Sequence, residues 1–97
     1  MGFVRANERF RVDLEGIEFA MKGEHSGRMV LCLVTYEALT DAMGGDPTLE
    51  ELNAWYKENQ GIVDGVAAAM LKADPSVEKL RVNTRNLNPD LFEIVHR

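Results

Sequence analysis

The sequence feature that most constrains the fold is an alternation of apolar and polar side chains within residues 10–34. Large apolar residues occupy every second position in residues 10–14 and again in residues 17–22, a period that is typical of a strand with one buried face. Residues 29–34 are apolar at every position, as in a strand that is covered on both faces or lies at the centre of a sheet. The pattern predicts three strands and excludes an all-helical fold.

Glycines mark the connections between these strands. Glu15 and Gly16 suit a two-residue turn, because glycine readily adopts a positive φ. Residues 23–27 have a glycine at each end and the composition of a hairpin loop. Two short connections between three consecutive strands predict an antiparallel meander.

Two helices are predicted after the meander. Thr35 can cap a short helix that runs through residue 43, and two consecutive glycines end it. A longer helix is predicted over residues 49–72, opened by a capping box between Thr48 and Glu51. On a helical wheel this helix has a wide apolar stripe, and Asp64 falls with other charged residues on the opposite side.

A fourth strand is predicted over residues 77–83, where Leu80 and Val82 alternate with charged and polar residues. The predicted element order is therefore β-β-β-α-α-β. An antiparallel sheet needs a cover on one face, and the amphipathic helix supplies it. We predict an α+β fold with two layers, in which an antiparallel sheet is covered by one long amphipathic helix and one short helix.

Ninety-seven residues can bury the core of one compact domain, so residues 1–97 are predicted to form a single domain. Within it we expect a loose N-terminus at residues 1–8 and an extended tail at residues 86–97. Residues 91–96 are apolar enough for a short fifth strand.

Charge and cysteine content narrow the class of protein. The chain has a net charge of −5, with mildly basic ends around an acidic middle at residues 36–64. This balance weakens a nucleic-acid function without excluding one, because a local basic patch can act against an acidic background. A single cysteine, the lack of a secretory signal and the lack of a membrane-length apolar run predict a cytoplasmic protein without membrane association.

A set of residues spread over the strands and the long helix carries a resemblance to a known family: Ile17, Phe19, the run 30–39, Trp55, Glu58, Asn59 and Ile62. Through these residues, part of the chain resembles the small bacterial family called domain of unknown function 1488. The resemblance covers about residues 10–83, and it departs from the family pattern at Gln60 and Gly61 and in the longer tail. It implies a small α+β domain and no activity, cofactor or catalytic residue.

Catalytic and cofactor signatures are missing from the sequence. Phosphate-binding glycine motifs do not occur, and the candidate metal ligands His25, Cys32 and His96 are scattered. We therefore assign no catalytic, cofactor-binding or metal-binding residue. The loop residues Glu24, His25 and Ser26 carry the enzyme hypothesis, with His25 as a general base or metal ligand, although an exposed loop histidine is the simpler interpretation.

Five basic residues form a candidate anion-facing set: Arg9, Arg11, Lys79, Arg81 and Arg85. If the first and fourth strands are neighbours, four of these cations share the open face of the sheet, which could bind RNA or single-stranded DNA. The simpler interpretation is a solvated face whose cations balance Asp13 and Glu18.

Small residues form a strip on the long helix, opposite its apolar stripe. Glycine inside a helix costs about 1 kcal/mol relative to alanine, so the two glycines need an explanation. One explanation is that the glycines allow a second subunit or the chain's own tail to approach the helix closely. The other explanation is a neutral surface that tolerates glycine, or a helix break near Gly61. The strip consists of Ala54, Gly61, Gly65 and Ala68.

Together these features favour a non-catalytic interaction or regulatory module that binds a protein partner, with a homodimer as one option. A nucleic-acid-associated protein that uses the basic residues is the first alternative. An enzyme with a histidine-containing loop is the second alternative.

Overall fold

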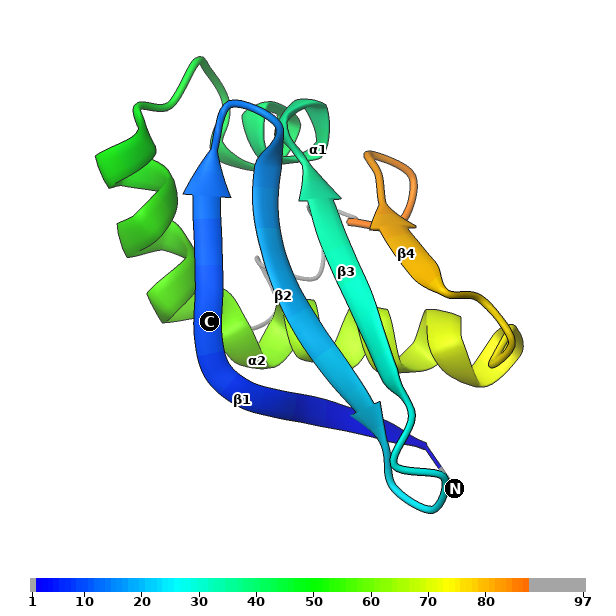
Figure 1. Ribbon diagram of the computed structural model, residues 1–97. Helices are drawn as coiled ribbons and strands as arrows, with labels where there is room; N and C mark the ends of the chain where they lie inside the picture. Colours follow the sequence, from blue (N-terminus) through cyan, green and yellow to red (C-terminus); the bar gives the residue numbers. More distant parts are fainter. Residues whose placement is uncertain (1, 88–97) are drawn as a thin grey trace.

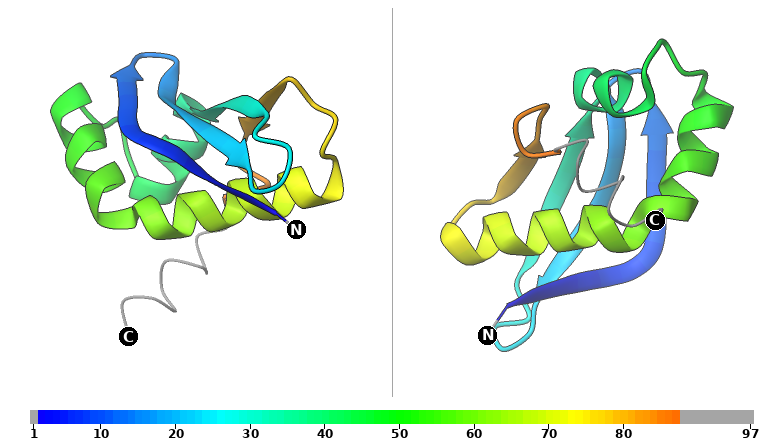
Figure 2. Two further views of the ribbon diagram at one scale, coloured as in Figure 1. Left: turned by 60° about the horizontal axis from the view of Figure 1, so that its bottom comes forward. Right: turned by 180° about the vertical axis from the view of Figure 1, so that it is seen from behind.

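The computed structural model describes residues 2–87, which form one sheet and two helices (Figure 1). The elements are β1 (Phe3–Asp13), β2 (Gly16–Gly23), β3 (Met29–Thr35), α1 (Tyr36–Met43), α2 (Leu49–Ala73) and β4 (Lys79–Val82). The strands follow the order β1-β2-β3-β4 in one sheet. Both helices lie on the same face, behind the sheet in Figure 1 and in front of it in the right-hand view of Figure 2. The predicted two-layer α+β fold is confirmed.

The prediction of a fully antiparallel sheet is wrong at one edge. β1, β2 and β3 form the expected antiparallel meander, but β4 pairs with β3 in parallel. After β3 the chain passes through α1 and then returns along α2 to the end of the sheet where β3 begins (Figure 2). Because this crossover ends where β3 begins, β4 runs in the same direction as β3.

The expected loose N-terminus is also wrong for residues 3–8, which lie in β1. The pairing of β1 with β2 is irregular between Arg5 and Phe10, and β1 bends there (Figure 1). The Arg9 amide donates a hydrogen bond to Asn7 Oδ1 at 2.8 Å within the irregular segment. A bulge interrupts the period of two, so the alternation of apolar residues does not reveal the first half of this strand. The predicted tail beyond residue 87, with the short strand at residues 91–96, lies outside the described residues.

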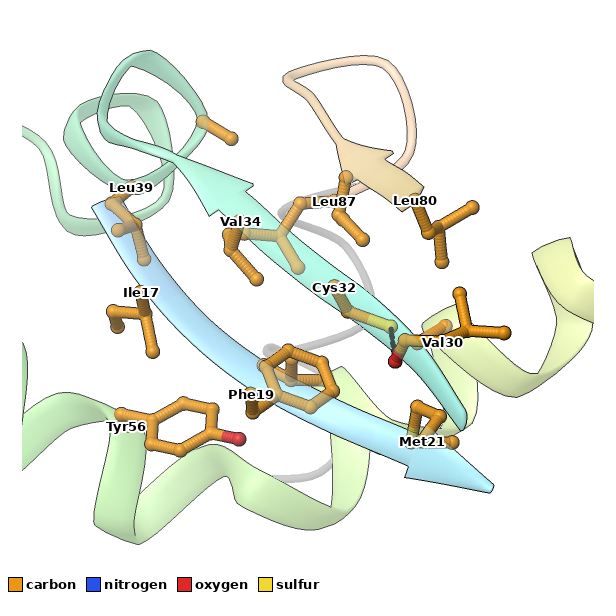
Figure 3. Packing of buried hydrophobic residues seen from close by; sticks show 14 of the residues in the cluster. Ile17, Phe19, Met21, Val30, Cys32, Val34, Leu39, Tyr56, Leu80 and Leu87 are labelled. Atoms are coloured by element: carbon orange, nitrogen blue, oxygen red, sulfur yellow. Dashed lines mark hydrogen bonds between the residues drawn. The ribbon is translucent and has the colours of Figure 1, made fainter. Parts of the chain in front are cut away.

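The hydrophobic core lies between the inner face of the sheet and the helices (Figure 3). Strand alternation directs Ile17, Phe19 and Met21 of β2 inward, and the Phe19 and Tyr56 rings meet with centroids 5.8 Å apart. Burying a large apolar side chain stabilises the fold by about 2 kcal/mol. The other buried hydrophobic residues are Val30, Cys32, Val34, Ala38, Leu39, Leu52, Val63, Ala67, Leu71, Leu80, Val82 and Leu87.

The long helix begins as predicted, with a reciprocal capping box. The Glu51 amide donates to Thr48 Oγ1 at 3.1 Å, and the Thr48 amide donates to Glu51 Oε1 at 3.0 Å. The hydrogen bond from the Thr48 backbone lowers the pKa of Glu51. The helix continues through both of its glycines, and its single interruption is a kink at Asn59, whose φ and ψ are −114° and 15°.

Candidate functional site

The outer face of the sheet is the main uncovered surface that the fold creates. Both described helices pack on the inner face (Figure 2, left), and the alternating burial along β2 and β3 indicates that their half-buried or exposed side chains face away from the core. Leu31 and Leu33 of β3 lie there and are only half-buried, and Met29 is 53% exposed. The continuous apolar run of β3 predicted a strand covered on both faces or at the centre of a sheet. β3 is an interior strand, but in the described residues only its inner face is covered.

The register of the strands sets out the outer face in rows. One row crosses the sheet from Arg11 through Glu18 and Leu33 to Arg81. The next row contains Ala20, Leu31 and Lys79. We call Leu31, Leu33, Glu15, Glu18, Lys79 and Arg81 the outer patch; together they line one hollow in the surface.

The basic residues do not form the single patch that neighbouring first and fourth strands would have made. β1 and β4 lie at opposite edges of the sheet, so that expectation is wrong. Arg9 and Arg11 belong to one edge, Lys79 and Arg81 to the other, and two strands separate them. Arg85 lies in the turn after β4, where its amide donates to Asn83 Oδ1 at 3.2 Å. Sequence patterning identified the outward side chains of the strands, but strand order depends on long-range contacts.

The two edges differ in how their charges are paired. Arg11 contacts Glu18 at 3.2 Å and Asp13 at 3.4 Å, so its charge is balanced locally. Lys79 and Arg81 are exposed and form no ion pair within residues 2–87. Unpaired positive charge therefore lies on the β4 side of the leucines, and carboxylates lie on the β2 side.

The small-residue strip of α2 is open surface in the described part of the chain. Ala54, Gly61 and Gly65 are exposed, whereas Ala68 is half-buried and packs against the core. A Cβ built on either glycine meets no described atom within 4 Å. The kink at Asn59 separates Ala54 from the other three residues. The structure therefore does not join all four residues into one contact surface.

The loop of Glu24, His25 and Ser26 borders a hollow of about 360 Å³ that Phe3, Arg28 and Lys72 also line. All three loop residues are exposed. Ser26 Oγ accepts a hydrogen bond from the Arg28 amide at 3.2 Å, and no hydrogen bond joins it to His25 in the described residues. The hydroxyl–imidazole hydrogen bond that activates a serine is therefore not formed between these two residues.

Arg28, beside this loop, has a structural role that the sequence did not reveal. Its guanidinium donates to the carbonyl oxygens of Pro75, Ser76 and Val77, with a distance of 3.0 Å to Ser76. These contacts fasten the β2–β3 loop to the connection between α2 and β4.

A buried polar cluster joins the first half of β1 to α2. The Arg5 guanidinium donates to both carboxylate oxygens of Asp64, at 2.8 and 2.9 Å, and to the Tyr56 hydroxyl. Burial alone would lower the pKa of Arg5, but its hydrogen bonds to Asp64 and Tyr56 outweigh burial and raise it. Burial also raises the pKa of Tyr56 to about 12. The cluster is a tertiary contact rather than an open site, because the Arg5 side chain is only 12% exposed.

The described residues contain neither a cluster of metal ligands nor an accessible thiol. No group of three or more His, Cys, Asp or Glu side chains in residues 2–87 is arranged to hold a metal ion. Cys32 is fully buried, and burial raises the pKa of its thiol to about 12, so the thiolate form is strongly disfavoured at neutral pH. Neither described helix meets the length and hydropathy needed for a membrane span.

Comparisons with protein-family models, with curated proteins and with solved structures found no match to this chain.

Proposed function

We propose that this chain is a cytoplasmic, non-catalytic interaction module and that the outer patch is its binding surface. The observation that carries the proposal is the position of Leu31 and Leu33 at the centre of a sheet face that no described element covers. Uncovered apolar side chains rimmed by polar residues are typical of protein interaction sites. The charged rim of Glu15, Glu18, Lys79 and Arg81 can orient a partner.

A nucleic-acid function has weaker support from the same surface. Carboxylates of Glu15 and Glu18 lie beside the leucines and would repel a phosphate backbone. The aromatic residues of the strands, Phe3, Phe10 and Phe19, pack with the core instead of offering stacking surfaces on the outer face. The cytoplasmic assignment is supported by the lone cysteine, which cannot form an internal disulfide.

The test of this proposal compares proteins captured by the wild-type chain and by a Leu31→Thr/Leu33→Thr variant from extract of the source cells. Threonine keeps the strand preference but removes most of the apolar surface. We expect proteins captured by the wild type, copies of the chain included, to be lost with this variant. A Leu49→Thr variant is the matched control, because Leu49 is a leucine on α2 that is 45% exposed. Equal capture by all three proteins would contradict the proposed binding surface.

A further inference from the structure

We propose that α2 is a hinged helix with two arms and that Arg5 is the clamp that holds it bent, so that release of the first three residues of β1 lets the helix open at Asn59. The three parts of this device are a kink in α2, one guanidinium that bonds to both sides of the kink, and a weakly anchored strand end. All three lie apart from the outer patch.

The two arms of α2 meet at Asn59. The first arm, residues 49–58, lies beside β1, and the second arm, residues 60–73, crosses the inner face of the sheet (Figure 1 and Figure 2). At the junction the φ and ψ of Asn59 leave the helical range, and its side-chain amide donates to the Trp55 carbonyl oxygen at 2.8 Å. A side chain that enters the ladder of backbone hydrogen bonds is a recognised cause of helix kinks. Asn59 is therefore the point at which the helix bends.

The Arg5 guanidinium joins the two arms. One nitrogen, Nη2, donates to the Tyr56 hydroxyl of the first arm and, at 2.8 Å, to Asp64 Oδ1 of the second arm. In a continuous helix eight residues advance about 12 Å along the axis, and the tilt of side chains toward the N-terminus points Tyr56 away from Asp64. The shared bond to Nη2 therefore belongs to the bent form. A contact that exists in one of two forms shifts the equilibrium toward that form.

The bent form also carries a cost. Asn59 Oδ1 and Arg5 Nη1 are buried and have no hydrogen-bond partner in the described residues, which destabilises the form in which they occur. The first arm buries Leu52 and Tyr56, so the bent form is still the major one. The open form is then a minor population whose size depends on the bonds that Arg5 makes.

The end of β1 that carries Arg5 is weakly anchored. We call residues 3–5 the strap; they pair with residues 21–23 of β2, and the irregular segment of β1 separates them from the regular ladder. Phe3 is half-buried and Val4 is 47% exposed, so no residue of the strap is fully buried. The strap can therefore leave β2 while the second half of β1 stays paired, and its release takes Arg5 away from both arms.

The first experiment measures the distance between the two arms in the full chain by double electron–electron resonance. Nitroxide labels are placed at Glu50→Cys and Ala69→Cys, two exposed positions, while the buried Cys32 stays unlabelled. A continuous helix separates these positions by about 28 Å, so the bent form gives a shorter distance. We expect the wild type at the shorter distance, and Arg5→Met to add a second population at the longer one.

Native-state hydrogen exchange distinguishes local opening from a general loss of stability. Arg5→Met should raise the ratio of exchange rates, first arm to second arm, about tenfold or more. Tyr56→Phe keeps the ring in the core and the Arg5–Asp64 pair intact, but removes the hydroxyl by which Arg5 holds the first arm, so it should raise the same ratio. Arg9→Met is the matched control, because Arg9 is an exposed arginine on the same strand, and it should leave the ratio unchanged.

Three results would overturn the proposal. One is an Arg5→Met variant whose arm distance and exchange ratio match those of Arg9→Met. The second is equal acceleration of both arms, which indicates a contact that only stabilises the whole fold. The third is a wild type whose labels already lie at the distance of a continuous helix. If Arg5→Met does not fold, Tyr56→Phe decides, and an exchange ratio equal to that of the wild type would reject the clamp.

Discussion

Arg5 is a charged residue on the inner side of the sheet, and three partners from other elements hold it there. Besides its hydrogen bonds to Asp64 and Tyr56, its guanidinium carbon lies 5.2 Å from the ring centroids of both Phe19 and Tyr56. Burying a charge is costly unless it is paired, so the contribution of Arg5 depends on Asp64. The cluster ties the first half of β1 to the middle of α2.

Removing one member of this cluster should cost more than replacing both charged members. Asp64→Ala leaves the Arg5 guanidinium buried without its carboxylate, and we expect a loss of about 3 kcal/mol in the free energy of unfolding. Arg5→Met/Asp64→Leu replaces the pair with apolar groups of similar volume and should cost less than the sum of the single changes. Urea unfolding of the wild type, Arg5→Met, Asp64→Leu and the double variant measures the coupling, and purely additive effects would show that the pair is not energetically linked.

The sequence did not predict this cluster because the wheel placed Asp64 on the solvent side. The kink at Asn59 breaks the regular 100° advance on which the wheel depends. Asn59 itself is 3% exposed, and its side-chain amide donates to the Trp55 carbonyl oxygen at 2.8 Å. A signal was present: on the wheel, Asn59 falls about 20° from Leu52, so a polar residue interrupts the apolar stripe.

At the scale of elements, most of the helices and strands could be predicted from local sequence patterns. The predictions that were wrong, those of strand direction and strand order, concern long-range contacts. The alternation in β2, the glycine-bounded hairpin loop and the capping box of α2 are all local, and the structure confirms them. The direction of β4 and its distance from β1 depend on how the crossover packs, which no local pattern contains. The same holds for the candidate site. Local alternation predicted which side chains of the strands face outward, but it could not predict which of these side chains lie side by side.

Gly61 and Gly65 give a test of the small-residue strip at this scale. Both are exposed and a Cβ on either one meets open space among the described residues, so Gly61→Ala and Gly65→Ala should each stabilise α2 by about 1 kcal/mol. Thermal or urea unfolding measures the gain. Destabilisation by either alanine would instead indicate that another backbone approaches the strip closely.

At the scale of the whole molecule, the two layers leave one face of the sheet protected and the other open. The inner face buries Val30, Cys32 and Val34, while the outer face leaves Leu31 and Leu33 half-buried. β3 is thus an interior strand whose inner face is buried in the core and whose outer face is partly exposed. Side chains on the outer face can therefore rearrange without unfolding the protein.

Cys32 reports on the integrity of that core. Its thiol is fully buried and has a pKa of about 12, so a thiol reagent should modify it only when the molecule unfolds. We expect the labelling rate at neutral pH to follow the equilibrium population of the unfolded form, which falls exponentially as the free energy of unfolding rises, so that Asp64→Ala is labelled faster than the wild type. Rapid labelling of the folded wild type would reveal a local opening around β3 instead.

The parallel pairing of β4 with β3 also affects the order in which the strands pair during folding. The hairpins of β1, β2 and β3 join residues close in sequence, whereas Leu31 and Lys79 are more than forty positions apart. Contacts between distant positions form late in folding because the loop between them must first be closed. A nascent chain therefore presents the carboxylates of Glu15 and Glu18 before the cations of β4 are in place. The outer patch proposed as the binding surface is therefore complete only in chains that have finished folding.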